Sequence, residues 1–223
     1  MIEQDNKKIG NALIISGALF TLVFWLGLII AAIGLRLEGT YTDHLSQIND
    51  NPTFYVINFV FASLTGPLTA IIMVVLTLFV KTRKPTPLLN ILSLLFLSAY
   101  LVLVCIAYAS QYTYFMNLLR SNNEMAIEWL FRNFNSIPYF IQQLGYMFFA
   151  LSGILLGYRF LLDKGIKRVF GYFLEIRCLI TIVAFIGLAL GNQQLNYVTI
   201  ISGLLTAFLG IFAIAIGINV KKI

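Results

Sequence analysis

The sequence predicts an all-α integral membrane protein that crosses the bilayer six times. Six long apolar stretches run through a chain that is 60% hydrophobic and only 11% charged. About 20 apolar residues are what an α-helix needs to cross about 30 Å of hydrocarbon. Because no water satisfies the backbone there, and no alternating barrel pattern is present, the stretches must be helical. We expect one domain over residues 1–223, a six-helix bundle with spans at residues 11–34, 55–80, 87–110, 137–161, 169–190 and 195–219.

Basic residues gather at alternate gaps between these spans. Lysines and arginines within residues 7–8, 81–84, 159–168 and 221–222 fall at one set of ends, and only Arg36, Arg120 and Arg132 fall at the other. Because positively charged loops stay in the cytoplasm, both termini are predicted to be cytoplasmic. These turns, in contact with anionic headgroups, also explain the net charge of +6, so we expect a lipid bilayer and no nucleic acid as partner. A bacterial inner (cell) membrane is the expected location.

The two outer loops are long, and the second, residues 111–136, is expected to carry a short helix. Ser121-Asn-Asn-Glu124 matches a capping box, in which the two end side chains satisfy free N–H groups of a first helical turn. Apolar residues follow at helical spacing, with Glu128 and Arg132 as an i, i+4 pair. We therefore predict an interfacial helix, which either plugs the gap between the third and fourth spans or acts as a moving lid.

Two spans carry residues that shape helix packing. Pro67 in the second span removes a backbone donor and crowds the carbonyl of Ser63, which predicts a bend that either only shapes the helix or opens a binding site. In the sixth span, Gly203, Gly210 and Gly217 recur every seven residues, a pattern that allows close helix approach. This glycine face serves packing within the chain, a homo-oligomer or a membrane partner.

Charge inside the spans is confined to Glu175 and Arg177 in the fifth. Ionisable groups within a bilayer are costly and are candidates for function. Both residues lie within about 12 Å of the cytoplasmic start of the predicted span, so their side chains can reach the headgroups. Arg159, at the end of the fourth span, can also pair with Glu175. We expect structural pairing or snorkelling, with a proton, ion or lipid-headgroup site as the alternative.

Neutral polar side chains cluster on the third and fourth spans. Tyr100 and Tyr108 share one face of the third span, and Gln143 and Tyr146 share one face of the fourth. Tyr100 and Tyr146 lie at similar depths, about 15 and 13 Å below the outer ends of their helices. Phenols and an amide that converge on an apolar cavity can orient a small ligand. Hydrogen bonding between the helices is the alternative role.

The chain carries little of the chemistry that enzymes use. Its single histidine, His44, lies in the first outer loop, which excludes bis-histidine haem, HExxH zinc sites and serine–histidine proteolysis. We therefore expect no catalytic residue, metal or cofactor. The favoured hypothesis is a non-enzymatic protein that binds or passes a small amphipathic or lipid-like molecule between the third and fourth spans. The alternative is an accessory subunit of a membrane complex that docks through the glycine face.

Two of the basic turns carry a family resemblance. The turn after the fourth span contains Gly157-Tyr-Arg159 and then Lys164-Gly-Ile-Lys-Arg-Val-Phe-Gly171, and the turn before the third contains Lys84-Pro85 leading into Leu88-Leu89. This pattern resembles an uncharacterised bacterial six-helix membrane family, domain of unknown function 4386. The resemblance implies a six-helix membrane fold and no established activity.

Overall fold

A computed structural model describes residues 2–34, 37–83 and 87–221, and these residues form helices and turns with no strand. Six helical segments are long and apolar enough to cross a membrane, as predicted. The segments are built on α1 (Ile2–Gly34), α3 (Pro52–Arg83), α4 (Pro87–Tyr112), α7 (Ile137–Leu161), α8 (Ile166–Ala189) and α10 (Val198–Lys221). The chain is therefore a multi-pass, all-α membrane protein. Arg36, Lys84, Pro85 and Lys222, which entered the predictions above, lie outside the described residues.

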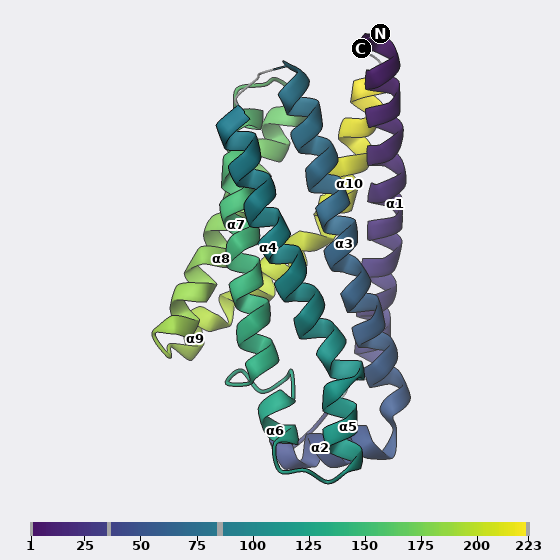
Figure 1. The fold of residues 1–223 in the computed structure, drawn as a ribbon, viewed down its shortest axis with the longest axis vertical. Coiled ribbons are helices and arrows are strands. Elements are labelled where there is room, and N and C mark those ends of the chain that lie inside the picture. The colour runs from purple at the N-terminus through teal and green to yellow at the C-terminus, as the bar shows by residue number, and fades with distance from the viewer. Residues whose placement is uncertain (1, 35–36, 84–86, 222–223) are drawn as a thin grey trace.

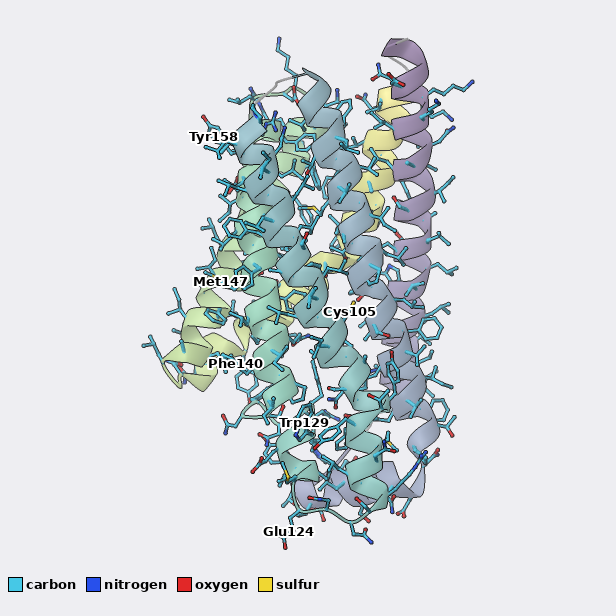
Figure 2. The ribbon with its side chains drawn as sticks, in the orientation of Figure 1. Cys105, Glu124, Trp129, Phe140, Met147 and Tyr158 are labelled. Atoms are coloured by element: carbon cyan, nitrogen blue, oxygen red, sulfur yellow. The ribbon has the colours of Figure 1, made fainter. Side chains whose placement is uncertain are left out.

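The six helices form a closed ring in the order α1, α3, α4, α7, α8 and α10. Both chain termini lie at one end of the bundle, here called the terminal end, and the opposite end is the loop end (Figure 1). Tyr158 lies near the terminal end and Glu124 at the loop end (Figure 2). α10 starts beside α8 and α9 (Gln193–Asn196), short of the loop end where α2, α5 and α6 lie, and crosses the bundle to finish beside α1 (Figure 1). Its two halves therefore have different neighbours.

Glycines bring α10 into backbone contact with α1 near the terminal end. A Cβ placed on Gly210 would lie 2.7 Å from the carbonyl oxygen of Gly17, and one on Gly217 would lie 2.7 Å from that of Gly10. Gly10 and Gly17 thus repeat on α1 the seven-residue spacing of their partners on α10. Small residues at such a seam let two helix backbones approach closely. Because α1 covers Gly210 and Gly217, these two positions serve packing within the chain and are not available to a partner helix.

Towards the loop end the seven-residue register between α1 and α10 continues, but the two helices are no longer in close contact. The next position on α1 is Phe24, seven residues after Gly17, and it falls opposite Gly203 on α10. A Cβ on Gly203 would meet nothing within 4 Å. A bulky ring therefore replaces the third glycine of α1, and the two helices diverge where that replacement occurs.

The second outer loop is helical, but its helices do not begin at the predicted capping box. α4 is followed, after a break at Thr113, by α5 (Tyr114–Arg120), and a single turn forms α6 (Ala126–Trp129). α5 continues the packed face of α4 because four of its apolar side chains are buried. The chain therefore stays helical for longer than the predicted third span.

Ser121 ends a helix where it was predicted to begin one. Its hydroxyl donates to the carbonyl oxygens of Asn117 and Leu118, both at 3.0 Å, within the last turn of α5. Such bonds to preceding carbonyls compete with the N-cap role of serine. The predicted capping box is wrong for this reason. α6 ends at Trp129, so Glu128 and Arg132 do not lie on one helix as predicted.

The first outer loop contains a helix that was not predicted, α2 (Tyr41–Asp50). It begins with a capping box, in which the Asp43 N–H donates to the Thr40 hydroxyl oxygen at 3.3 Å and the Thr40 N–H donates to the Asp43 carboxylate at 2.7 Å. Hydrogen bonds from Thr40 hold the pKa of Asp43 below its usual value. The Thr40-x-x-Asp43 spacing was the signal that could have found this helix.

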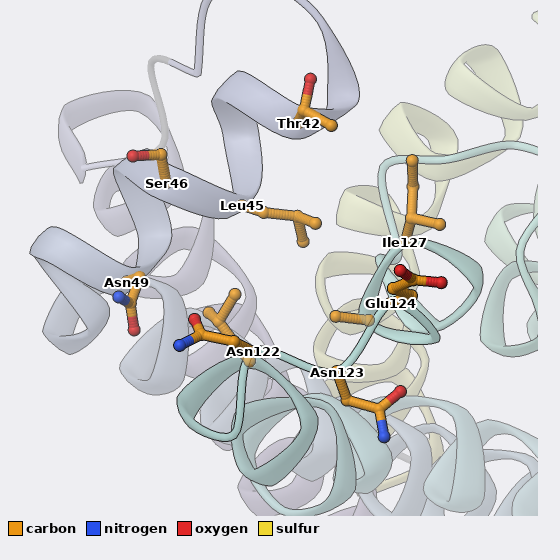
Figure 3. A pocket seen from close by; sticks show the side chains of 10 residues that line it. Thr42, Leu45, Ser46, Asn49, Asn122, Asn123, Glu124 and Ile127 are labelled. Atoms are coloured by element: carbon orange, nitrogen blue, oxygen red, sulfur yellow. The ribbon is translucent and has the colours of Figure 1, made fainter.

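α2 lies across the loop end against α5 and α6 (Figure 1). A groove of about 460 Å³ runs between them, and Leu45, Asn49, Asn122 and Ile127 project towards it (Figure 3). Glu124 is the one charged side chain in its described lining. Among those lining residues, none has a buried polar atom without a hydrogen-bond partner. The groove therefore has no buried polar group in its described lining that a ligand would satisfy.

His44 makes the loop end sensitive to acid. Its side chain is 8% exposed, and its Nδ1 has no hydrogen-bond partner among the described residues. Burial, and then the positive charge of Arg132, lower the pKa of His44, against a smaller opposing effect of Asp43. Because the pKa is lower in the folded state, protonation favours unfolding. This contribution to stability is full above the unfolded pKa of about 6.5 and is lost as the pH falls towards the folded value.

We therefore expect the hydrogen-exchange protection factors of α2 to fall as the pH is lowered from about 7.5 to about 5.5. Amides of α8, far from His44, provide the internal control and should keep their protection. A His44→Gln variant cannot gain the proton and should show no such fall. The same pH dependence in wild type and His44→Gln would assign the effect to another group.

Candidate functional site

The candidate site is a pair of adjoining chambers inside the helix ring, here called the ring cavity. The larger chamber, about 340 Å³, is bounded by α1, α4, α7, α8 and α10. The smaller one, about 130 Å³, lies between α1, α3, α4 and α10 and also touches α7. Six residues line both chambers: Phe24, Leu28, Tyr108, Tyr146, Gly203 and Thr206.

The predicted tyrosine layer between α4 and α7 forms. The rings of Tyr100 and Tyr146 stack with centroids 5.9 Å apart, in agreement with their predicted common depth. The hydroxyls of Tyr108 and Tyr146 are 2.8 Å apart, and Gln142 donates to the Tyr108 hydroxyl at 2.7 Å. The two roles considered for these tyrosines therefore coexist, because the phenols tie the helices together and also line the ring cavity.

Gln143 reaches across the cavity to α10 and does not join the tyrosines. Its side-chain nitrogen donates to the Thr199 hydroxyl oxygen at 3.0 Å, and that hydroxyl donates to the Gln143 Oε1 at 3.2 Å. Both residues line the larger chamber. The Gln143 amide therefore forms part of the cavity wall and links α7 to α10.

Arg177 points into the bundle. Its side chain is 1% exposed, and its guanidinium carbon lies 4.1 Å from the centroid of the Phe149 ring. Nε and Nη2 donate to the Thr206 hydroxyl oxygen at 3.1 and 2.8 Å. α8 begins at Ile166, so Arg177 lies about 16 Å along the helix, near its middle. The predicted snorkelling is wrong, because the helix starts three residues earlier than the predicted span and Arg177 faces the ring interior.

The charge of Arg177 lacks an acidic partner in the part of the chain that the structure describes. Its hydrogen bonds go to one neutral hydroxyl, and Nη1 has no hydrogen-bond partner. Buried charges in proteins are normally paired, because removing an ion from water costs several kcal/mol. The contact with Phe149 offsets about 0.5–2 kcal/mol of this cost. Arg177 lines the larger chamber, so this chamber is bordered by an uncompensated cation whose Nη1 has no hydrogen-bond partner.

The predicted pair of Arg159 and Glu175 does not form. Arg159 is buried and donates to the Asn90 Oδ1 and to the carbonyl oxygen of Val80, on α4 and α3. Oε1 of Glu175 has no hydrogen-bond partner among the described residues. Residues two apart on a helix point about 200° away from each other. Because Arg177 faces the interior, Glu175 faces outwards, where the missing side chain of Gly157 leaves room for its carboxyl group.

Pro67 lies inside α3, which continues past it to Arg83. The Thr65 hydroxyl donates to the carbonyl of Ala62 at 2.6 Å, within the turn that precedes the proline. Thr65 and Thr69, on either side of Pro67, line the smaller chamber. The proline segment therefore forms part of the wall of the ring cavity.

The ring cavity opens sideways between α1 and α10. Leu28, Ile200 and Leu204 lie at this opening with 37%, 55% and 58% of their surface exposed. These apolar side chains belong to helices that span the membrane, so their exposed surfaces face lipid. The polar groups of the cavity lie deeper. The arrangement therefore offers an apolar entrance to a polar interior.

Several residues of the site were not predicted from the sequence. Gln142 bonds to the tyrosine layer, and Ser202 accepts or donates a 2.6 Å hydrogen bond with Thr181 of α8. Thr199, Ser202 and Thr206 follow one another at i, i+3 and i+7, which places three hydroxyls on one face of α10. That spacing was the available signal. It indicates a polar helix face that needs a partner inside the bundle.

The fold and the cavity define a class: a six-helix membrane bundle with a polar chamber that opens towards lipid. Comparisons with protein-family models, with curated proteins and with solved structures gave no match. The resemblance to domain of unknown function 4386 therefore stays a prediction.

Proposed function

We propose that this chain is a non-enzymatic integral membrane protein that binds or passes a small amphipathic molecule in the ring cavity, beside the tyrosine layer of α4 and α7. The observation that carries the proposal is the cavity itself. Its larger chamber of about 340 Å³ is within the size range of small-molecule sites. An amphipathic molecule matches both of its parts, since a polar group can meet the phenols and amides while an apolar part lies in the opening to lipid.

Gly203 provides the experiment. Because a side chain at this position meets open space, Gly203→Leu should narrow the opening without disturbing the fold. We expect hexadecanol, an uncharged single-chain amphiphile, to bind wild-type protein in a nonionic detergent, as read by native mass spectrometry. Gly203→Leu should lose most of this binding at an unchanged melting temperature, and Gly203→Ala, the matched control, should keep it. Equal binding by all three proteins would contradict the proposal.

The proposed orientation has both termini in the cytoplasm and the chain in a bacterial inner (cell) membrane. It is supported by the basic residues near the terminal end and by the positive-inside rule. The two termini share one end of the bundle, as an even number of spans requires (Figure 1).

Cysteine labelling tests this orientation. Single cysteines at Asp50 and Asn123, exposed at the loop end, should react with an impermeant maleimide in intact cells. A cysteine at Lys164, exposed between α7 and α8, should react only after the membrane is permeabilised. Wild type is the background control, because its own two cysteines lie within spanning helices. Labelling at Lys164 in intact cells would reverse the orientation.

A further inference from the structure

We infer that the molecule held in the ring cavity carries an anionic headgroup, a carboxylate, and that Arg177 binds it through Nη1. The inference rests on the proposed function, since it names the charge of the amphipathic ligand. Two independent observations meet at this residue: a guanidinium that is 1% exposed lines a chamber of about 340 Å³, and one of its nitrogens has no partner there.

The surroundings of Arg177 leave one nitrogen of the guanidinium without a hydrogen-bond partner. Phe149 covers a face of the group, and Thr206 occupies Nε and Nη2. The Thr206 hydroxyl donates its own hydrogen to the carbonyl of Ser202 at 2.8 Å, so it can only accept from the arginine. Thr206 is therefore a neutral support that orients the group. Nη1 remains as the donor for a further acceptor.

An anion completes this arrangement better than a neutral group does. No described acidic side chain pairs with Arg177, and Glu175 on the same helix faces outwards, against Gly157. A buried cation without a counter-charge is costly in a bilayer. A bound anion restores neutrality inside the ring and forms a charge-assisted hydrogen bond, which is about twice as strong as a neutral one.

The size and shape of the site favour a carboxylate on a single chain. A guanidinium presents a planar set of N–H donors that matches the two oxygens of a carboxylate. The Tyr146 hydroxyl and the Thr199 hydroxyl line the same chamber and offer further neutral contacts. A chamber of about 340 Å³ is near the lower limit of small-molecule pockets, which suits one headgroup and the start of one chain. The rest of the chain leaves through the apolar opening beside Gly203.

The experiment compares palmitate with hexadecanol, which has the same chain length and no charge, on purified full-length protein in a nonionic detergent. We expect wild type to bind palmitate about tenfold or more tightly than hexadecanol, because only palmitate forms the charge-assisted bond. Arg177→Met should reduce palmitate binding to the level of hexadecanol and leave hexadecanol binding unchanged. Arg177→Lys keeps the charge and should retain part of the preference.

The melting temperature separates ligand binding from a structural role of Arg177. Replacing an unpaired buried charge by an apolar side chain of similar length is often neutral or stabilising. Ligand-free Arg177→Met should therefore melt no lower than ligand-free wild type, and palmitate should raise the melting temperature of wild type more than that of Arg177→Met. The comparison of the two amphiphiles on wild type needs no variant. It therefore tests the preference for a carboxylate headgroup even if Arg177→Met fails to fold.

Each of the other outcomes overturns a defined part of the inference or of the proposed function. Equal binding of palmitate and hexadecanol to wild type would overturn the anionic headgroup and leave the proposed function standing. Binding of neither molecule would overturn the proposed function as well. A rise in melting temperature with chloride alone, in wild type and not in Arg177→Met, without a preference for palmitate, would assign the site to an inorganic anion and overturn the carboxylate.

Discussion

Gly210→Leu is expected to cost about 3 kcal/mol or more of folding free energy, the upper part of the range for overpacking. A Cβ at this position would lie 2.7 Å from the carbonyl oxygen of Gly17 and closer still to the Thr21 hydroxyl oxygen. Because one of these atoms belongs to the backbone of α1, the clash is relieved only when the two helices separate. Thermal melting in detergent, followed by circular dichroism, measures the loss.

Gly203→Leu is the matched control for this substitution. It introduces the same side chain seven residues away on the same helix, where a Cβ meets nothing within 4 Å. We expect its melting temperature to equal that of wild type. Equal destabilisation by the two variants would mean that leucine is disfavoured anywhere on this face of α10, and that backbone contact with α1 is not the cause.

The second large effect is expected at Asn90, whose Oδ1 accepts a hydrogen bond from the buried guanidinium of Arg159. A hydrogen bond to a charged group contributes about 1.5–3 kcal/mol, so Asn90→Ala should lose about that amount. Glu175→Gln should change stability by about 0.5 kcal/mol or less, because Oε1 of that carboxyl has no partner in the described structure.

Double-mutant cycles distinguish Asn90 from Glu175 as a side-chain partner of Arg159. Arg159→Met combined with Asn90→Ala should cost less than the sum of the single changes, since each removes the same bond. Arg159→Met combined with Glu175→Gln should be additive within about 0.5 kcal/mol. Coupling of Arg159 to Glu175, with additivity at Asn90, would restore the ion pair that was predicted from the sequence.

The spans could be predicted because length and hydropathy alone decide which segments cross a bilayer. Local loop structure could be predicted only in part. Thr40-x-x-Asp43 and Ser121-x-x-Glu124 have the same capping pattern, yet only the first starts a helix. Upstream of Ser121, apolar residues extend the packed face of α4 and keep the chain helical, so the serine meets the end of a helix. Tertiary packing decides between two uses of one local pattern.

The tyrosine layer was predictable because depth along a helix follows from residue count, and Tyr100 and Tyr146 do stack. The depth of Arg177 was predicted to be too shallow, because α8 begins three residues before the predicted span. Glu175 and Arg177 are two residues apart on one helix and cannot both face the same side. Which of them faces inwards depends on Thr206 and Phe149, contacts from other helices that no local pattern contains.

The seam between α1 and α10 also has a consequence for the order of synthesis. These helices are the first and last spans of the ring, and α10 begins about 160 residues after α1 ends. At a translation rate of about 5–20 residues per second, α1 waits roughly 10 to 30 s in the membrane before the glycines of α10 arrive. Thr206 arrives with them, and until then Arg177 on α8, made 29 residues earlier, lacks the hydroxyl that orients it. Ring closure and the enclosure of the buried cation are therefore one event, the last in the assembly of this bundle.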